Sequence, residues 1–396
     1  MVEQLDLGEL RNIVENLVAS AQVLQEAIDR NYVSEHLSTI LSTHYDIGEL
    51  TDIKKLDRGY VNVSYTIKTK KDDRERLYFL RRYKRGIREE EIRFEHSIVK
   101  HLMRKHFDLA AGLVFRNDGG TYVKEIEKRD NESGEVYYAI FEFLTGEDKY
   151  TWDNPCCSEC ELADEARVLA RYHSAVHDLK YEGRRYEAKI IDLLPTIAGN
   201  LMKYAKRAGD TKFDAYFLKH LDYTLRIIDE TLGQLRRDEY GQMPQLAIHS
   251  DYHPGNLKFK EDSVVGLFDF DWSKIDVRCF DVALAVTYAC TTWEGKEDGD
   301  FMLDRVQIFL DAYQDESGKA DGIGPLTEVE TKYLPIMIKA SNIYVLNWDV
   351  DDFYIKKPNP YEYLTYLQHN VRAMRWIEGN WGDLVSTVAE SLFAHN

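Results

Sequence analysis

The chain has 396 residues, of which 44% are hydrophobic and 12% aromatic, enough for two or three packed units. Its 51 basic and 69 acidic residues give a formal net charge of −18, which argues against nucleic acid or an anionic membrane as a partner. The chain begins with MVEQLD, which lacks the blocks of a secretory signal, and no apolar run is long enough to span a bilayer, so we expect a cytoplasmic protein.

Residues 1–48 are predicted to form a helical extension. Apolar residues recur at helical spacing between Leu10 and Ile28, and a second helix is expected over 34–43. Such an amphipathic extension either packs on the rest of the chain, which we favour, or joins two copies in a homodimer.

From Leu50 the apolar residues alternate with polar ones, which indicates antiparallel strands. Val63, Tyr65 and Ile67 lie on one side of the first such strand, and a charged turn leads into a strand over 77–83. Residues 89–105 then form an amphipathic helix pattern. Further strand-like runs occupy 113–115, 121–124 and 137–143.

The rest of the chain is predicted to be mostly helical. His173 lies in the first of these helices and is expected to pack in the core. Cys156, Cys157 and Cys160 are read as reduced thiols, with a metal site as the alternative. Several tryptophans and acids either fill the core, which we favour, or line a substrate pocket: Trp272, Trp293, Trp348, Asp349, Asp351 and Asp352. The helices are expected at 161–180, 212–238, 281–292, 299–314, 328–347 and 360–377.

The most informative segment begins with a short apolar strand at 246–248. A polar loop with Pro254 and Gly255 interrupts it, and strands at 256–259 and 264–268 then form a hairpin that ends in Asp269. This hairpin brings the Asp251–Asn256 loop and Asp269 together. Two carboxylates and an amide oxygen at one place form a hard ligand set, which suits Mg²⁺.

These motifs resemble the aminoglycoside phosphotransferase and choline kinase-like superfamily. The pattern His-x-Asp-x-x-x-x-Asn is matched by His249, Asp251 and Asn256, and the following acidic pair by Asp269 and Asp271. A third motif, an Asp before a helix of small apolar residues, is matched by Asp281. The layout looks closest to homoserine kinase-like members. The resemblance implies an α+β, protein-kinase-like fold with an N-lobe at 49–144, a helical C-lobe at 145–396, and a nucleotide between the two lobes.

The resemblance also implies roles for the residues of the loop. Asp251 would accept or orient the proton of the substrate hydroxyl, and Asn256 with Asp269 would ligate Mg²⁺ at the phosphates of ATP. His249 would brace the loop, and Asp281 would tie the loop to the helix that follows.

In the N-lobe, the same resemblance implies a set of residues around ATP. Gly59 and Asn62 belong to the turn that would cover the phosphates, although a plain hairpin turn is the alternative. Arg81 stands where the family places its phosphate-binding cation, and Glu95 is the acid that would pair with that cation unless it faces the surface. Backbone groups around the hinge, at Glu142 and Leu144, would contact adenine.

The sequence therefore predicts a kinase that moves the terminal phosphate of ATP to a hydroxyl of a small metabolite. Homoserine, an amino alcohol, an amino sugar or an aminoglycoside-like compound would be the acceptor. The alternative is a catalytically silent nucleotide-binding scaffold of the same fold. A protein kinase is disfavoured because Asp269-Phe270-Asp271 lacks the glycine of the Asp-Phe-Gly motif.

Overall fold

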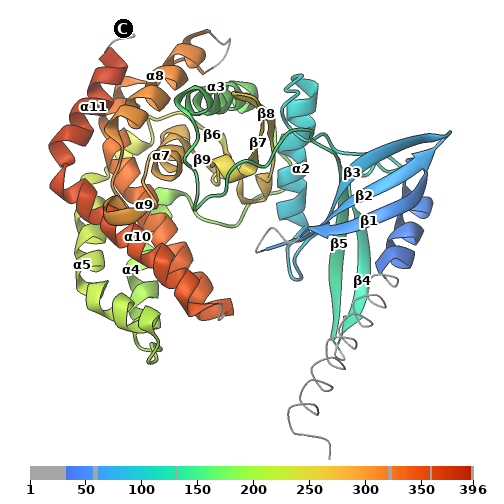
Figure 1. Ribbon diagram of the computed structural model, residues 1–396, viewed down its shortest axis with the longest axis horizontal. Helices are drawn as coiled ribbons and strands as arrows, with labels where there is room; N and C mark the ends of the chain where they lie inside the picture. The colour runs from blue at the N-terminus through green and yellow to red at the C-terminus, as the bar shows by residue number, and fades with distance from the viewer. Residues whose placement is uncertain (1–32, 57–60, 130–131, 320–322, 357–358, 394–396) are drawn as a thin grey trace, which may run out of the picture. The chain divides into compact units, whose positions relative to one another are not determined.

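The computed structural model describes residues 33–56, 61–129, 132–319, 323–356 and 359–393. They form two compact units (Figure 1). The sheet unit comprises the residues up to 87 together with 113–143, and the helical unit comprises 88–112 together with the residues from 144 onward. This arrangement confirms the predicted α+β fold with an antiparallel sheet and a mostly helical part. The helix expected around residues 10–28 and the turn residue Gly59 lie outside the described residues.

The sheet unit is built on five antiparallel strands in the order β1-β2-β3-β5-β4. Asp72 and Asp73 close the β2–β3 hairpin with left-handed backbone angles, φ 48° and 60°, as a tight two-residue hairpin turn requires. The predicted strand at 113–115 is reduced to a single bridge from Leu113 to Phe141, because the chain turns back at Arg116, whose N–H donates to the Gly120 carbonyl. The strands are β1 Glu49–Leu56, β2 Val63–Lys71, β3 Arg74–Arg82, β4 Val123–Arg129 and β5 Glu132–Glu142.

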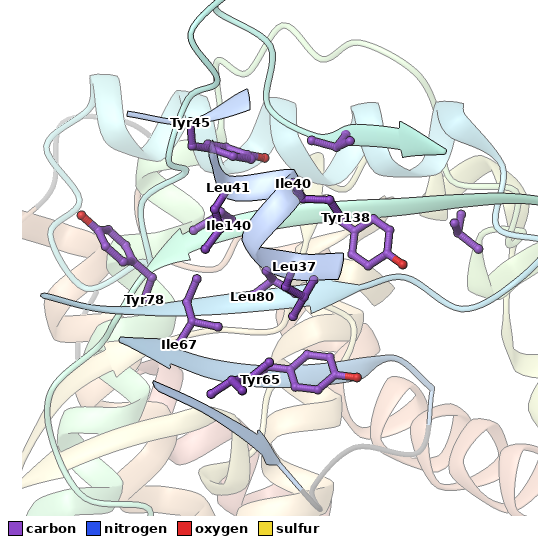
Figure 2. Close-up of a cluster of buried hydrophobic side chains, with 13 residues drawn as sticks. Leu37, Ile40, Leu41, Tyr45, Tyr65, Ile67, Tyr78, Leu80, Tyr138 and Ile140 are labelled. Atoms are coloured by element: carbon purple, nitrogen blue, oxygen red, sulfur yellow. The ribbon is translucent and has the colours of Figure 1, made fainter. Parts of the chain in front are cut away.

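A helix over 33–44 covers one face of this sheet and matches the helix predicted at 34–43. Its apolar residues Leu37, Ile40 and Leu41 pack on the alternating apolar residues of the strands (Figure 2). Burial of this stripe explains why the segment folds as a helix here: it supplies the apolar contacts that a short isolated helix lacks. The cluster includes Leu37, Ile40, Leu41, Tyr45, Ile53, Tyr65, Ile67, Tyr78, Leu80, Val123, Val136, Tyr138 and Ile140.

Helix α2 (Glu89–Arg104) follows the β3 strand in sequence but groups with the helical unit. Arg185 forms an ion pair with Glu91 at 3.2 Å, and the Arg184 N–H donates to the Glu90 carbonyl at 3.0 Å. Near the other end of the helix, His101 Nε2 lies 3.0 Å from the Ala175 carbonyl oxygen. The boundaries predicted for the two lobes, at 49–144 and 145–396, stay predictions.

The helical unit contains the helices expected from the apolar periodicity, and its described residues also form α4, the short α6 and α11, which were not expected as separate helices. Helix α4 carries Pro195 inside the helix, where proline cannot donate the helical hydrogen bond to the Ile191 carbonyl and therefore obscures the helical signal. The helices are α3 Glu159–Val176, α4 Ile190–Ala205, α5 Lys212–Gln234, α6 Arg237–Tyr240, α7 Arg278–Ala289, α8 Leu303–Lys319, α9 Glu328–Lys356, α10 Pro360–Gly379 and α11 Trp381–Phe393. Within the described residues, no helix has the length and apolar character needed to cross a membrane.

Two small antiparallel sheets lie within the helical unit, near α7 (Figure 1). The first pairs β6 (Gln245–Ile248) with β9 (Lys274–Val277), and the second pairs β7 (Leu257–Lys260) with β8 (Ser263–Leu267). The strands predicted at 246–248, 256–259 and 264–268 are therefore confirmed. Between them lie two short turns of 3₁₀-helix, η1 (Pro254–Asn256) and η2 (Phe270–Trp272).

A buried acid on α3 makes the stability of the chain depend on pH. Burial raises the pKa of Glu165 to about 8, against the opposing influences of Arg305 and Cys157. The folded chain therefore keeps this carboxyl protonated at pH values where the unfolded chain ionises it. We expect the free energy of unfolding to fall as the pH rises from about 4.5 to about 8, by up to about 1.4 kcal/mol per pH unit. Urea unfolding of the wild type and Glu165→Gln across this range checks the prediction, because the variant should lose that slope; an unchanged slope would assign it to other groups.

Candidate active site

The polar loop between β6 and β7 is held in an uncommon conformation by its own sequence. Strand β6 ends at Ile248, and Ser250 then adopts a left-handed backbone, φ 65°. His253 accepts the Gly255 N–H through Nδ1 at 3.0 Å, and Pro254 fixes the start of η1. These local constraints restrict the backbone conformation of loop residues 251–256.

The hairpin that follows brings the two predicted metal ligands together. Leu257 pairs with Leu267, and the Phe268 N–H donates to the Asn256 carbonyl at 3.2 Å. Asn256 therefore lies beside the end of β8, where Asp269 follows. Asp269 adopts a left-handed backbone, φ 69°, which ends the extended strand and turns the chain into η2.

Asp281, in the first turn of α7, holds the start of the loop. Its Oδ2 accepts the His249 N–H and its Oδ1 accepts the Ser250 N–H, both at 2.8 Å. His173 Nε2 lies 3.0 Å from the same carboxylate, and its Nδ1 lies 2.8 Å from the Tyr313 hydroxyl. All of this is buried, which confirms the bracing role predicted for Asp281 and the packed position predicted for His173.

Replacing Asp281 with asparagine should destabilise the chain. An amide at this position has one acceptor oxygen instead of two, so at least one buried N–H of the loop loses its charge-assisted hydrogen bond. We expect a loss of about 3 kcal/mol in the free energy of unfolding, measured by urea titration. A loss below about 0.5 kcal/mol would show that the carboxylate does not hold the loop.

His249 supports the loop from inside. The imidazole is fully buried, and Nε2 lies 3.0 Å from the Phe268 carbonyl oxygen, so this nitrogen carries the proton and donates. Burial lowers the pKa of His249, against the raising influence of Asp281 and Asp251. The buried His249 ring thus connects the start of the loop to the end of β8, which agrees with the bracing role predicted for it.

Asp251 has the properties of a group that accepts a hydrogen bond or a proton from a substrate. Its side chain keeps 27% of its surface exposed. The Asn256 amide donates to both the backbone oxygen and the Oδ2 atom of Asp251, at 2.9 and 3.0 Å. Burial raises the pKa of Asp251, but His253, His249 and Asn256 outweigh that effect, so the pKa lies below its ordinary value. The carboxylate is therefore ionised at neutral pH.

His253 is a candidate functional residue to which the sequence motifs assigned no role. Its Nε2 atom lies 3.7 Å from Asp251 Oδ1. Since Nδ1 accepts the Gly255 N–H, the neutral ring carries its proton on Nε2, the atom that faces the carboxylate. The spacing Asp-x-His in the motif was the available signal, because it places the histidine two residues from the acid.

The donor set beside Asp251 fits a magnesium ion bound together with nucleotide phosphates. Both Asn256 hydrogen bonds use the amide nitrogen, which leaves its oxygen beside Asp269 for a cation. Mg²⁺ binds proteins through one or two oxygen ligands plus phosphates and water. The described residues contain no group of three or more His, Cys, Asp or Glu side chains that could hold a metal ion.

The residues predicted to bind ATP are spread over both units. In the sheet unit, Asn62 Oδ1 accepts the Lys84 N–H at 3.0 Å, which ties Asn62 to the chain just after β3. Arg81 is buried on the sheet face opposite the 33–44 helix, with its Cζ 5.6 and 5.7 Å from the ring centroids of Phe79 and Phe141. Glu142 is the last residue of β5.

Two of the predicted ATP-binding residues belong to the helical unit. Glu95 is buried within α2, so the surface-facing alternative considered for it is wrong. Leu144 is the first residue of the chain after the sheet unit ends at Phe143. The roles assigned to these residues in nucleotide binding stay predictions.

The cysteines and tryptophans singled out in the sequence form no part of the catalytic loop. All five cysteines are free, and burial raises the pKa of Cys157 to about 12, which leaves its thiol protonated and unreactive. Trp293 and Trp348 belong to an aromatic cluster centred on Trp152, a residue that the sequence analysis did not single out. The Trp152 ring also lies 4.3 Å from that of Tyr366.

An antiparallel sheet unit, together with a helical unit that carries this loop and the hairpin after it, is the architecture of a kinase-like phosphotransferase. Residues 52–315 match the phosphotransferase enzyme family, and the chain belongs to that family. It is a small-molecule kinase, a phosphotransferase that acts on a small metabolite, and the resemblance noted in the sequence is confirmed.

Individual relatives agree with this assignment. A homoserine kinase of Parvibaculum lavamentivorans is 26% identical over 341 residues, covering 84% of this chain and 92% of the relative. Among solved structures, an amicoumacin kinase in complex with AMP-PNP and Ca²⁺ aligns with a TM-score of 0.60 at 15% identity, covering 88% of this chain and 95% of that one. A microcompartment-associated aminopropanol kinase aligns with a TM-score of 0.57 at 15% identity, covering 89% and 99%.

Proposed function

We propose that the chain is a cytoplasmic, ATP- and Mg²⁺-dependent kinase whose acceptor is a small alcohol that also carries an amino group. Homoserine is the first candidate, because relatives named as homoserine kinases align with 84% of this chain. The observation that carries the proposal is the ionised, partly exposed Asp251 carboxylate, oriented by Asn256 beside Asp269.

The reaction then follows from what these side chains can do. The substrate hydroxyl donates a hydrogen bond to Asp251, which takes its proton as the oxygen attacks the terminal phosphorus of ATP and ADP departs. Asn256 keeps the carboxylate oriented towards the acceptor. Mg²⁺ held by Asn256 and Asp269 would neutralise charge on the phosphates. Because little covalent chemistry falls to the protein, positioning of the hydroxyl is its main contribution.

An amino group on the acceptor is supported by unsatisfied acceptor atoms in α9. Asp349 and Asn342 lie seven residues apart on one face of this helix and are both fully buried. Asn370 donates to Asp349 Oδ2 at 2.6 Å and accepts from Asn342, yet Asp349 Oδ1 and Asn342 Oδ1 have no partner in the described part of the chain. A buried acceptor without a donor is costly, and an ammonium group would supply the donor that Asp349 Oδ1 lacks.

Aromatic residues lie between Asp349 and the catalytic loop in the proposed acceptor site. Burial raises the pKa of Tyr288, with smaller contributions in the same direction from Asp251 and Asp349, and the Tyr288 ring centroid lies 5.2 Å from that of His253. The loop also touches the Trp152 cluster: a Cβ on Gly255 would meet the Trp152 backbone nitrogen at 3.1 Å. Aromatic faces near a carboxylate suit an ammonium group.

We expect Asp349→Asn to raise the KM for an amino alcohol by about 10- to 100-fold, the loss of a hydrogen bond to a charged group. Burial raises the pKa of Asp349 well above its ordinary value, so a neutral amide should be tolerated at this position and the variant should fold normally. The KM for ATP serves as the internal control and should not move. Steady-state kinetics with both substrates varied makes the test, and an equal change in both KM values would point to general damage.

The proposal is tested by ADP release from Mg²⁺-ATP with homoserine, choline, ethanolamine, amino sugars and aminoglycosides as acceptors. We expect turnover with an amino-bearing alcohol, abolished in Asp251→Asn. Binding of ATP without turnover on any acceptor would instead support the catalytically silent scaffold. Turnover on an alcohol without an amino group, at equal kcat/KM, would reject the acceptor class but keep the kinase.

A further inference from the structure

A hollow opens at one end of the sheet unit and lies wholly within that unit. Its volume is about 470 Å³, within the range of sites that hold small molecules. Its walls are residues 46–47 and the end of the β2–β3 hairpin, with Lys71, Asp72, Arg74, Arg76 and Tyr78. None of these residues belongs to the catalytic loop or to the residues predicted to bind ATP.

The walls of the hollow are fixed by the backbone. Thr69 donates from its hydroxyl to the Ile47 carbonyl at 2.7 Å, which ties the incoming chain to β2. Gly48 has φ +93°, and a Cβ there would lie 2.3 Å from the Lys70 carbonyl oxygen. Only glycine permits this approach, so the segment before β1 is held against the end of the hairpin. The hollow is therefore a defined feature of the fold.

The face of the sheet that forms the hollow changes from apolar to basic along its length. Leu80 and Tyr78 belong to the apolar cluster under the 33–44 helix, and Arg76 and Arg74 continue the same side of β3 beyond it. Figure 2 shows Tyr78 at the margin of that cluster, with its hydroxyl directed away from the apolar side chains. A hydroxyl and two guanidinium groups thus follow one another along one strand.

Two arginines that line the hollow have no ion-pair partner within the described residues. Lys71 is neutralised by Asp46, with Nζ 2.6 Å from Oδ2. Arg74 and Arg76 form no ion pair or hydrogen bond through their guanidinium groups within the described residues. With Asp72 as the remaining acid, the hollow keeps a net charge of about +1 in a chain of net charge −18.

We propose that this hollow is a second ligand site, which binds a small phosphate monoester. Guanidinium groups match the oxygens of a phosphate group with paired hydrogen bonds, and two of them on one strand can hold the same dianion. The Tyr78 hydroxyl supplies a further donor, and the volume leaves room for the organic part of the ligand. The site stands independently of the proposed function, because it shares no residue with the catalytic loop.

The test is calorimetric titration of inorganic phosphate and of glycerol 3-phosphate into the full chain. Three proteins are compared: the wild type, the double variant Arg74→Ala with Arg76→Ala, and a control, Arg236→Ala with Arg237→Ala. The control also removes two exposed arginines, with side chains 64% and 67% exposed, from α6 and the residue before it in the helical unit. A third variant, Asp72→Asn, removes the acid of the hollow at a left-handed position that asparagine tolerates.

We expect the wild type and the control to bind the monoester alike, and the Arg74/Arg76 variant to bind it at least tenfold more weakly. Asp72→Asn should bind it severalfold more tightly, because a repulsive charge is gone. Undiminished binding in the Arg74/Arg76 variant would place the anion elsewhere in the chain and overturn the proposal. So would the absence of binding to the wild type, or weaker binding in Asp72→Asn. Kinase activity is not part of the readout, so failure here is separate from failure of the proposed function.

Discussion

Asp251→Asn will lower kcat by about 10²- to 10⁴-fold, the usual contribution of a positioned general base. The substitution keeps the shape of the side chain, and its amide oxygen can still accept the Asn256 amide hydrogen bond seen at 3.0 Å. Folding and the affinity for Mg²⁺-ATP should therefore remain near those of the wild type, while proton transfer from the acceptor hydroxyl is lost. The measurements are the steady-state kcat and the dissociation constant of the nucleotide.

A matched control for this prediction is Asp262→Asn, which removes an exposed acid from the turn between β7 and β8. It should leave kcat unchanged. Because the pKa of Asp251 lies below its ordinary value, the wild type should also show no loss of activity from protonation of this group near neutral pH. A kcat within about threefold of the wild type in Asp251→Asn would remove this residue from the chemistry.

Asp269→Ala is expected to reduce kcat/KM for Mg²⁺-ATP by about 10³-fold. Loss of this carboxylate leaves the Asn256 oxygen as the one remaining side-chain ligand proposed for Mg²⁺. Neutralisation of phosphate charge by a metal ion is worth several kcal/mol. The Mg²⁺ concentration at half-maximal activity should rise in parallel. Asp262→Asn again provides the control, since it removes an acid from the same hairpin but away from Asn256. An unchanged dependence on Mg²⁺ would show that the metal is held elsewhere.

The arrangement of the loop separates bracing from chemistry. Asp281 and His249 are fully buried, and both carboxylate oxygens of Asp281 and Nε2 of His249 form hydrogen bonds within the loop and the hairpin. Asp251 is the member of the motif that keeps an exposed surface and a depressed pKa. A hydrogen-bonded scaffold around one available carboxylate is what preorganisation of a reacting group requires.

The elements around the site could be predicted because their determinants are local. The residues from Ile248 to Asp281 are close in sequence, and the hairpin register that joins Asn256 to the end of β8 follows from two short apolar runs and a turn. The bracing role of Asp281 followed from the family resemblance and was confirmed by two backbone hydrogen bonds.

The residues that were missed depend on contacts between distant parts of the chain. Trp152 reaches its cluster by packing on Trp293, Trp348 and Tyr366, and no local pattern distinguishes it from any other exposed-looking aromatic residue. Asn342 is defined by an atom that lacks a partner, which only three-dimensional structure reveals. Helix α4 was missed for a different reason, since Pro195 and Gly199 weaken its periodic signal although its apolar face is buried.

The central claim is that the chain transfers phosphate to an amino-bearing alcohol with Asp251 as the group that accepts the proton of the hydroxyl. The decisive measurement is transfer of label from γ-³²P-ATP to homoserine by the wild type, Asp251→Asn and Asp262→Asn. We expect labelled phosphohomoserine from the wild type and from Asp262→Asn, and a loss of at least about 100-fold in Asp251→Asn. Equal labelling by all three proteins would contradict the assignment of Asp251 as the group that receives the proton of the acceptor.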